Sequence, residues 1–125
     1  MMNLRCTSFA TRQDLAAFGS CVTKGGTPQD CLNVGDNGVG AWNEPTWEPH
    51  ASPPICAMGE DYPHNTLVKV TLAIGHGQPF VCIVKDRGPS GTIDLAPSAL
   101  LAAGLDADYQ LLTTAEVEVL PKINQ

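Results

Sequence analysis

The sequence predicts a small, mostly β domain, and three observations support this. Its 125 residues are enough for one domain with its own core and too few for two. The 12 glycines and 10 prolines are scattered rather than periodic, which is typical of short strands joined by many turns. The longer apolar stretches are brief and partly alternating, as in β-strands, and only two short segments carry helical signals.

Residues 1–35 are predicted to be an N-terminal extension with one short helix. Thr11, followed three residues later by Asp14, resembles an N-cap with an acidic partner in the first turn. Gly19 is expected to end this helix, and residues 24–30 have the composition of a loop.

The remaining residues, 36–125, are predicted to form the β domain. Three glycines in residues 34–42 indicate a strand that other backbone approaches closely. Residues 42–54 contain four prolines and both tryptophans, so they are expected to form a long surface loop.

The clearest local prediction is a β-hairpin. Residues 67–73 alternate in part, residues 75–78 have turn composition, and residues 80–84 form a continuous apolar run. That run is expected to be a strand buried on both faces.

Shorter elements follow the hairpin. Residues 86–91 are expected to form a tight loop and residues 92–95 a very short strand. A proline at the start and a glycine just past the end predict a helix over residues 97–104. Residues 114–120 alternate, which predicts a last strand with two inward side chains, Val117 and Val119.

Charge and hydropathy argue against two classes of partner. The formal net charge is −6 with seven Lys and Arg, so the basic face needed by a nucleic-acid-binding protein is not expected. An acidic chain is also a poor fit to anionic membranes, and its apolar runs are far shorter than the roughly 20 residues of a membrane span. No signal peptide is visible, so either an export signal was trimmed or the protein leaves its cell by another route.

The five cysteines allow two interpretations. Two disulfides with one free thiol is one, and five reduced, mostly buried thiols is the other. Cys21 and Cys31 flank a glycine-rich loop and are the best pair in an oxidising compartment, whereas Cys56 and Cys82 lie in strand-like runs where packed thiols are expected. No Cys-x-x-Cys spacing occurs, so neither a metal site nor a cofactor is predicted.

Residues 85–100, KDRGPSGTIDLAPSAL, resemble the signature of the rare lipoprotein A family. That family has a hydrophobic strand, Asp-Arg-Gly-Pro, a short glycine-containing loop, Ile-Asp-Leu and a small helix. Residues 65–70 match its Gly-Thr-x-Val-x-Val strand, and residues 55–59 lie where it has a strand ending in an Ala-Ala-His-like sequence. The resemblance covers roughly residues 38–120.

The resemblance implies a fold and an activity. The fold is a six-stranded double-psi β-barrel, shared with barwin-like proteins, expansins and some lytic transglycosylases. The activity is binding or non-hydrolytic cleavage of peptidoglycan or another polysaccharide. Asp86 and Asp94 fall on the two acidic positions of the family, and Asp94 is the stronger candidate for the general acid. Such an acid needs a raised pKa, which burial or a nearby like charge provides.

Structural roles for the same aspartates remain open. Asp86 can accept backbone N–H bonds that fix the turn, and Asp94 can brace the start of the next helix. The histidine of the family is also missing here, because residues 57–60 read Ala-Met-Gly-Glu. His64 replaces it only if the loop folds back, so binding without catalysis is an alternative.

Four other residues are candidate substrate contacts. Trp42 and Trp47 carry flat rings of the kind that stack on sugars, with Trp42 expected in the core and Trp47 exposed. Asp36 is expected either to stabilise a turn or to face the cleft. Arg87 is expected to pair with Asp86 or with an acidic group of the substrate.

The leading functional hypothesis is a module that binds peptidoglycan or cleaves it as a lytic transglycosylase, with Asp94 as the acid and Asp86 in support. A wall-active protein without an export signal is what a bacteriophage encodes, so an extracellular or virion-associated location is expected. The alternative is a non-catalytic head or tail component of a virus particle, in which residues 1–35 dock on other virion proteins. A third reading is a barwin-like or expansin-like binder that loosens polysaccharide without cutting it.

Overall fold

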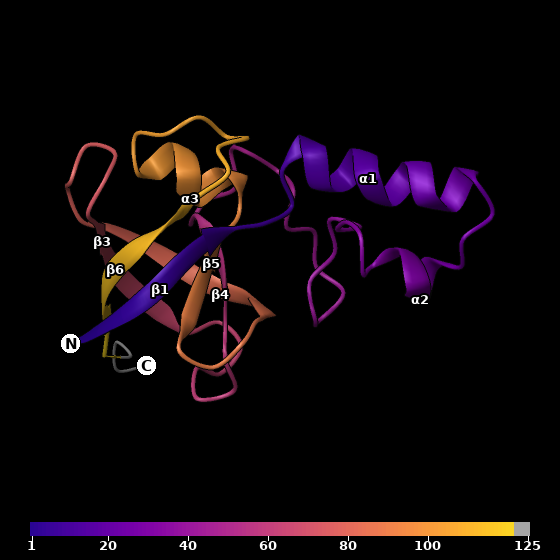
Figure 1. Ribbon diagram of the computed structural model, residues 1–125. Coiled ribbons are helices and arrows are strands. Elements are labelled where there is room, and N and C mark those ends of the chain that lie inside the picture. The colour runs from indigo at the N-terminus through magenta and orange to yellow at the C-terminus, as the bar shows by residue number, and fades with distance from the viewer. Residues whose placement is uncertain (122–125) are drawn as a thin grey trace.

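A computed structural model describes residues 1–121 (Figure 1). Its helices and strands follow one another in this order: β1 (Met2–Ser8), α1 (Arg12–Thr23), α2 (Pro28–Cys31), β2 (Ile55–Met58), β3 (Leu67–Leu72), β4 (Phe80–Arg87), β5 (Thr92–Leu95), α3 (Pro97–Ala102) and β6 (Leu112–Val119).

The six strands close into a ring in the order β1-β5-β2-β4-β3-β6, with β6 pairing back to β1. Two of the pairs, β1 with β5 and β2 with β4, are parallel, and the other four are antiparallel. The prediction of a mostly β domain is confirmed. The predicted hairpin is β3 and β4, and the short strand at residues 92–95 is β5.

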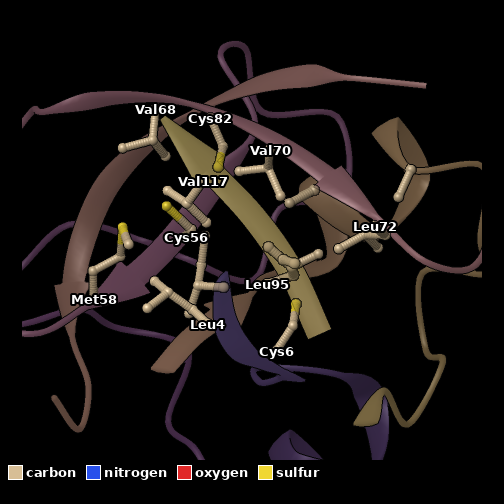
Figure 2. Close-up of a cluster of buried hydrophobic side chains, with 14 of the residues drawn as sticks. Leu4, Cys6, Cys56, Met58, Val68, Val70, Leu72, Cys82, Leu95 and Val117 are labelled. Carbon is tan, nitrogen blue, oxygen red and sulfur yellow. The ribbon is translucent and has the colours of Figure 1, made fainter. Parts of the chain in front are cut away.

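Alternate residues of each strand fill the inside of the ring (Figure 2). On β3 the buried side chains are Val68, Val70 and Leu72. The apolar run that begins β4 is not buried on both faces as predicted, because Val81 on its outer side is 37% exposed while Cys82 is buried. The outer face of the ring meets solvent here, so only every second residue is enclosed.

β1 corrects the predicted extension. Residues 2–8 belong to the ring, where β1 pairs in parallel with β5 and antiparallel with β6. Leu4 and Cys6 point inward and are buried. Two inward side chains among polar neighbours give too weak an alternation to predict a strand, and the pairing that stabilises β1 comes from residues about 90 positions away. The additional segment is therefore inserted between β1 and β2 rather than placed before the ring.

The inserted segment carries α1 and α2, which lie to one side of the ring (Figure 1). α1 begins with a full capping box between Thr11 and Asp14, as its sequence predicted. It continues beyond Gly19, because this glycine does not adopt the positive φ with which glycines commonly end helices. A disulfide joins Cys21 of α1 to Cys31 of α2.

Two further differences from the sequence predictions concern strands. Residues 34–42 form no strand; an isolated bridge between Val39 and Pro45 is the only pairing recorded there. In β6, Val117 is buried as predicted, whereas Val119 is 52% exposed at the end of the strand. Two glycines of residues 34–42, Gly35 and Gly40, instead allow close contacts with neighbouring backbone.

α3 follows β5 directly and closes one end of the ring. Ala99 and Leu100 are fully buried in the core cluster, and Gly104 follows the helix with a positive φ of 80°. The predicted helix is thus confirmed. No helix within residues 1–121 has the length and apolar character needed to cross a bilayer.

Candidate functional site

Asp94 and Asp86 lie in one row across the outer face of the ring. On β5, Asp94 stands between the inward-facing Ile93 and Leu95, so its side chain points outward. Ala57 of β2 is in register with Asp94 on one side and with Asp86 on the other. The two aspartates are therefore separated by two strand spacings, about 10 Å between their Cα atoms.

The same row continues into β1. Thr7 is in register with Asp94, and its hydroxyl donates a hydrogen bond to Asp94 Oδ1. The other carboxyl oxygen, Oδ2, is 3.4 Å from the position that a Cβ would take on Gly88. We call Thr7, Asp94, Ala57 and Asp86 the acidic row. Its central residue, Ala57, is small and almost fully buried.

A β-bulge places Asp86 in this row. Cys56 is in register with Val84, but the next residue of β2, Ala57, is in register with Asp86, so Lys85 is the extra residue. Without it, the alternation that buries Cys82 and Val84 would turn Asp86 toward the core. The bulge re-aims an acidic side chain, as bulges beside functional sites often do.

Asp94 has the electrostatics of a general acid. Burial and then the charge of Asp86 raise its pKa to about 6, and the charge of Arg5 opposes this only in part. A carboxyl with such a pKa is about half protonated near pH 6 and mostly ionised at pH 7. A raised pKa of this kind favours proton donation to a leaving oxygen.

Asp86 has the structural role expected for it. Its Oδ1 accepts hydrogen bonds of 2.8 Å from the backbone N–H groups of Ala41 and Arg87, so it does fix local backbone. Burial nevertheless raises its pKa, and the two backbone hydrogen bonds and the Arg87 charge oppose that rise. Asp94 does not brace the next helix, because the N-cap of α3 is Ala96 and carries no side-chain hydrogen bond.

Asp36 lies near the row from the inserted segment. Its Oδ1 accepts the N–H of Gly38 at 2.6 Å, which is the turn chemistry expected for it. Burial raises its pKa, and the charges of Asp86 and Asp14 add to the rise. Three carboxyls, on β4, β5 and this loop, therefore share one electrostatic environment.

A second group of side chains extends from β4 beside the acidic row. The guanidinium of Arg87 lies over the ring of Trp42, 4.7 Å from its centroid, and donates to the carbonyl oxygens of Met58 and Gly59. His64 stacks on Trp42 with a centroid distance of 4.1 Å. Trp42 thus contacts two side chains and, partly buried, packs against the core cluster, in agreement with its predicted place at the core.

His64 also pairs with the carboxylate of Glu44. Its Nε2 lies 2.5 Å from Glu44 Oε1, and Glu44 Oε2 accepts a 2.8 Å hydrogen bond from Lys85 at the bulge. Lys85 lowers the pKa of Glu44 most, followed by His64. His64 therefore contacts Trp42 and Glu44, and its role in the site stays a prediction.

Trp47 is exposed as predicted, with 47% of its surface accessible. It lines a groove of about 330 Å³ with residues of α1 and the start of α3, including Leu15 and Pro97. The structure thus places the two tryptophans in different surroundings, one partly buried and one exposed.

Thr7, Ala57, Glu44 and Lys85 are the site residues that sequence reasoning missed. Nothing in the sequence around Thr7 indicates that β1 joins β5, so its hydrogen bond to Asp94 was not predictable. The bulge at Lys85 was equally hidden, because the spacing of Asp86 and Asp94 along the chain does not reveal which face each side chain takes. Within residues 1–121, no three His, Cys, Asp or Glu side chains are grouped so as to hold a metal ion.

In comparisons with known proteins, no protein-family model matches this chain, and no curated protein matches it either.

Proposed function

We propose that the strand ring is a double-psi β-barrel of the rare lipoprotein A kind and that it cleaves peptidoglycan as a lytic transglycosylase. The observation that carries the proposal is the acidic row, in which a carboxyl with a pKa of about 6 lies beside a second carboxyl on a common outer face. The sequence resemblance over residues 85–100 and the two parallel strand pairs support the fold assignment. An extracellular or virion-associated location belongs to the same proposal.

Asp94 is the general acid in this proposal. Its Oδ2 gives a proton to the oxygen that leaves as the glycosidic C–O bond breaks. A hydroxyl of the same sugar attacks the anomeric carbon, forms the internal anhydro ring and returns its proton to Asp94. The acid is regenerated and no water is consumed. Asp86 supports the step because its charge contributes to the raised pKa of Asp94.

Thr7 is a positioning residue in this mechanism. Its hydroxyl engages Oδ1, which directs Oδ2 toward Gly88. The glycine leaves room there, since any side chain would begin within van der Waals contact of the carboxyl.

Incubation with purified peptidoglycan, followed by mass analysis for anhydro-sugar ends, tests the proposal. Wild-type protein should release such ends, and Asp94→Asn should slow their release by about 10²–10⁴-fold because it removes the acid. Asp30→Asn is the matched control, since Asp30 is an exposed aspartate of α2 outside the acidic row. Absence of product from the wild type, or equal product from Asp94→Asn, contradicts the proposal.

One observation favours a second function, a structural component of a virus particle. α1 has no buried residue, and exposed apolar side chains of the inserted segment include Val22, Leu32 and Val34. An apolar arm beside a closed ring suits docking onto a neighbouring subunit. Retention on insoluble wall material distinguishes the two functions, because a glycan-acting module is retained and a particle component is not.

A further inference from the structure

The groove beside Trp47 has mostly apolar walls and a charged pair at its edge. The indole of Trp47 lines it together with Leu15, Pro49 and Pro97, so most of its surface is apolar. At its edge, Arg12 Nε donates to Asp108 Oδ2 at 2.8 Å, and the Arg12 side chain is 87% exposed. The volume of about 330 Å³ lies at the small end of the range for small-molecule sites, roughly 300–1,000 Å³.

The inserted segment builds this groove. Leu15 belongs to α1 and Trp47 to the loop that follows it. Gly38 allows their contact, since a Cβ there would lie 3.0 Å from the Trp47 ring and 3.1 Å from Leu15. Five of the eight residues that line the groove therefore come from the inserted segment.

The groove also lies close to the acidic row. β1 and β5 are parallel, and Ala10 and Pro97, which line the groove, come three residues after Thr7 and Asp94. A fully extended chain covers at most about 11 Å in three residues, so both are within reach of a short oligosaccharide. Asp14, the neighbour of Leu15 on α1, is near enough for its charge to act on Asp94.

We propose that this groove is a sugar subsite, in which Trp47 stacks on the apolar face of one pyranose ring of the glycan whose bond is cleaved at Asp94. This inference rests on the proposed function and extends it. A pyranose ring has one face of C–H groups and an edge of hydroxyls. The indole and the prolines match the face, and the exposed Arg12–Asp108 pair supplies a donor and an acceptor for the hydroxyls.

The inference gives the inserted helix a role. α1 holds Leu15 and Arg12 against the ring, with the backbone N–H of Arg12 donating to Asp108 Oδ1 at 3.0 Å. The helix is then one wall of an extended glycan cleft rather than a free arm.

A binding experiment tests the subsite. A soluble tetrasaccharide of alternating N-acetylglucosamine and N-acetylmuramic acid is titrated into Asp94→Asn protein, which prevents turnover, and the two indole N–H signals are followed by NMR. The Trp47 signal should shift, and the partly buried Trp42 should serve as an internal reference. Adding Trp47→Ala should weaken binding by about tenfold, and adding Arg12→Ala should weaken it by a smaller factor. Val119→Ala, at an exposed apolar residue outside the groove, should leave the affinity unchanged.

The outcomes separate the subsite from the proposed function. If the tetrasaccharide binds but Trp47→Ala has no effect and the Trp47 signal does not move, the subsite is wrong and the proposed function stands. If neither wild-type nor Asp94→Asn protein binds the tetrasaccharide or wall material, and wild type releases no anhydro ends, both are overturned. Circular dichroism of each variant confirms that the fold is intact.

Discussion

At the scale of single residues, the main feature is a carboxyl placed where its charge is disfavoured. The unperturbed pKa of Asp94 is 3.8, and burial beside Asp86 raises it to about 6. The folded protein thus binds this proton more tightly than the unfolded chain does. The contribution to stability is fully present below about pH 3.8 and is lost as the pH rises through about 6.

Asp94→Asn should therefore be more stable than wild type at pH 8 and show little difference at pH 4. Two pKa units correspond to about 3 kcal/mol, and partial exposure of the carboxyl reduces the expected gain to roughly 1–2 kcal/mol. Urea unfolding at the two pH values measures it. Asp108→Asn should have the opposite sign at pH 8, since hydrogen bonds from Arg12 lower the pKa of Asp108. Equal stability of wild type and Asp94→Asn at pH 8 would contradict the conclusion that folding disfavours the charged form of Asp94.

Residue types indicated part of this site. Asp86 and Asp94 were identified from the Asp-Arg-Gly-Pro and Ile-Asp-Leu pattern, and the different exposures of Trp42 and Trp47 were predicted from their surroundings in the chain. Thr7 was not, because its role depends on strand register with a residue 87 positions away. His64 was a candidate on sequence proximity, and the structure shows it in contact with Trp42 and Glu44.

At the scale of elements, the bulge in β4 and the loop that contains Gly40 and Ala41 position Asp86. Gly40 lies against the bulge, where a Cβ would come within 2.2 Å of the Lys85 carbonyl oxygen. The next residue, Ala41, donates its N–H to Asp86. A glycine that the sequence suggested for a strand is used here for close packing of a loop on a strand.

Gly40→Ala should destabilise the protein by about 1–3 kcal/mol, the range for forcing extra atoms into a packed site. It should also reduce anhydro-sugar release, because the loop that binds Asp86 must shift. Gly19→Ala is the matched control: its Cβ meets open space within α1, so a stabilisation of about 0.5–1 kcal/mol is expected. Thermal unfolding of both variants measures the effects, and a neutral Gly40→Ala would contradict the packing described.

Local signals were sufficient for elements with local causes. The capping box of α1, the β3–β4 hairpin and the proline-started α3 all appear as predicted, since each depends on neighbouring residues. β1 and the bulge depend on partners far along the chain, and no local pattern reveals them.

At the scale of the whole molecule, ring closure encloses three free thiols. Cys6, Cys56 and Cys82 are fully buried in the core (Figure 2). Burial raises the pKa of Cys6 to about 12, with Asp94 and Cys82 adding to it, and raises that of Cys56 well above its usual value. Neither interpretation of the five cysteines is right, because the structure has one disulfide, between the favoured pair Cys21 and Cys31, and three packed thiols.

A thiol reagent at pH 8 should label none of these three cysteines in native protein and all three in concentrated guanidinium, because only unfolding exposes them. Mass spectrometry counts the labels. Cys21 and Cys31 should react only after reduction, which provides the internal control. Rapid labelling of any of the three in native buffer would show that the ring is open at that strand.

The proposed mechanism depends on a fold that keeps the pKa of Asp94 well above the ordinary range for an aspartate. A ¹³C NMR titration of the side-chain carboxyl, assigned by comparison with Asp94→Asn, measures this directly. The account predicts a midpoint of about 6 in wild type and a lower one in Asp86→Asn, since the neighbouring charge is then absent. A midpoint near 3.8 in wild type, or one unchanged by Asp86→Asn, would contradict it.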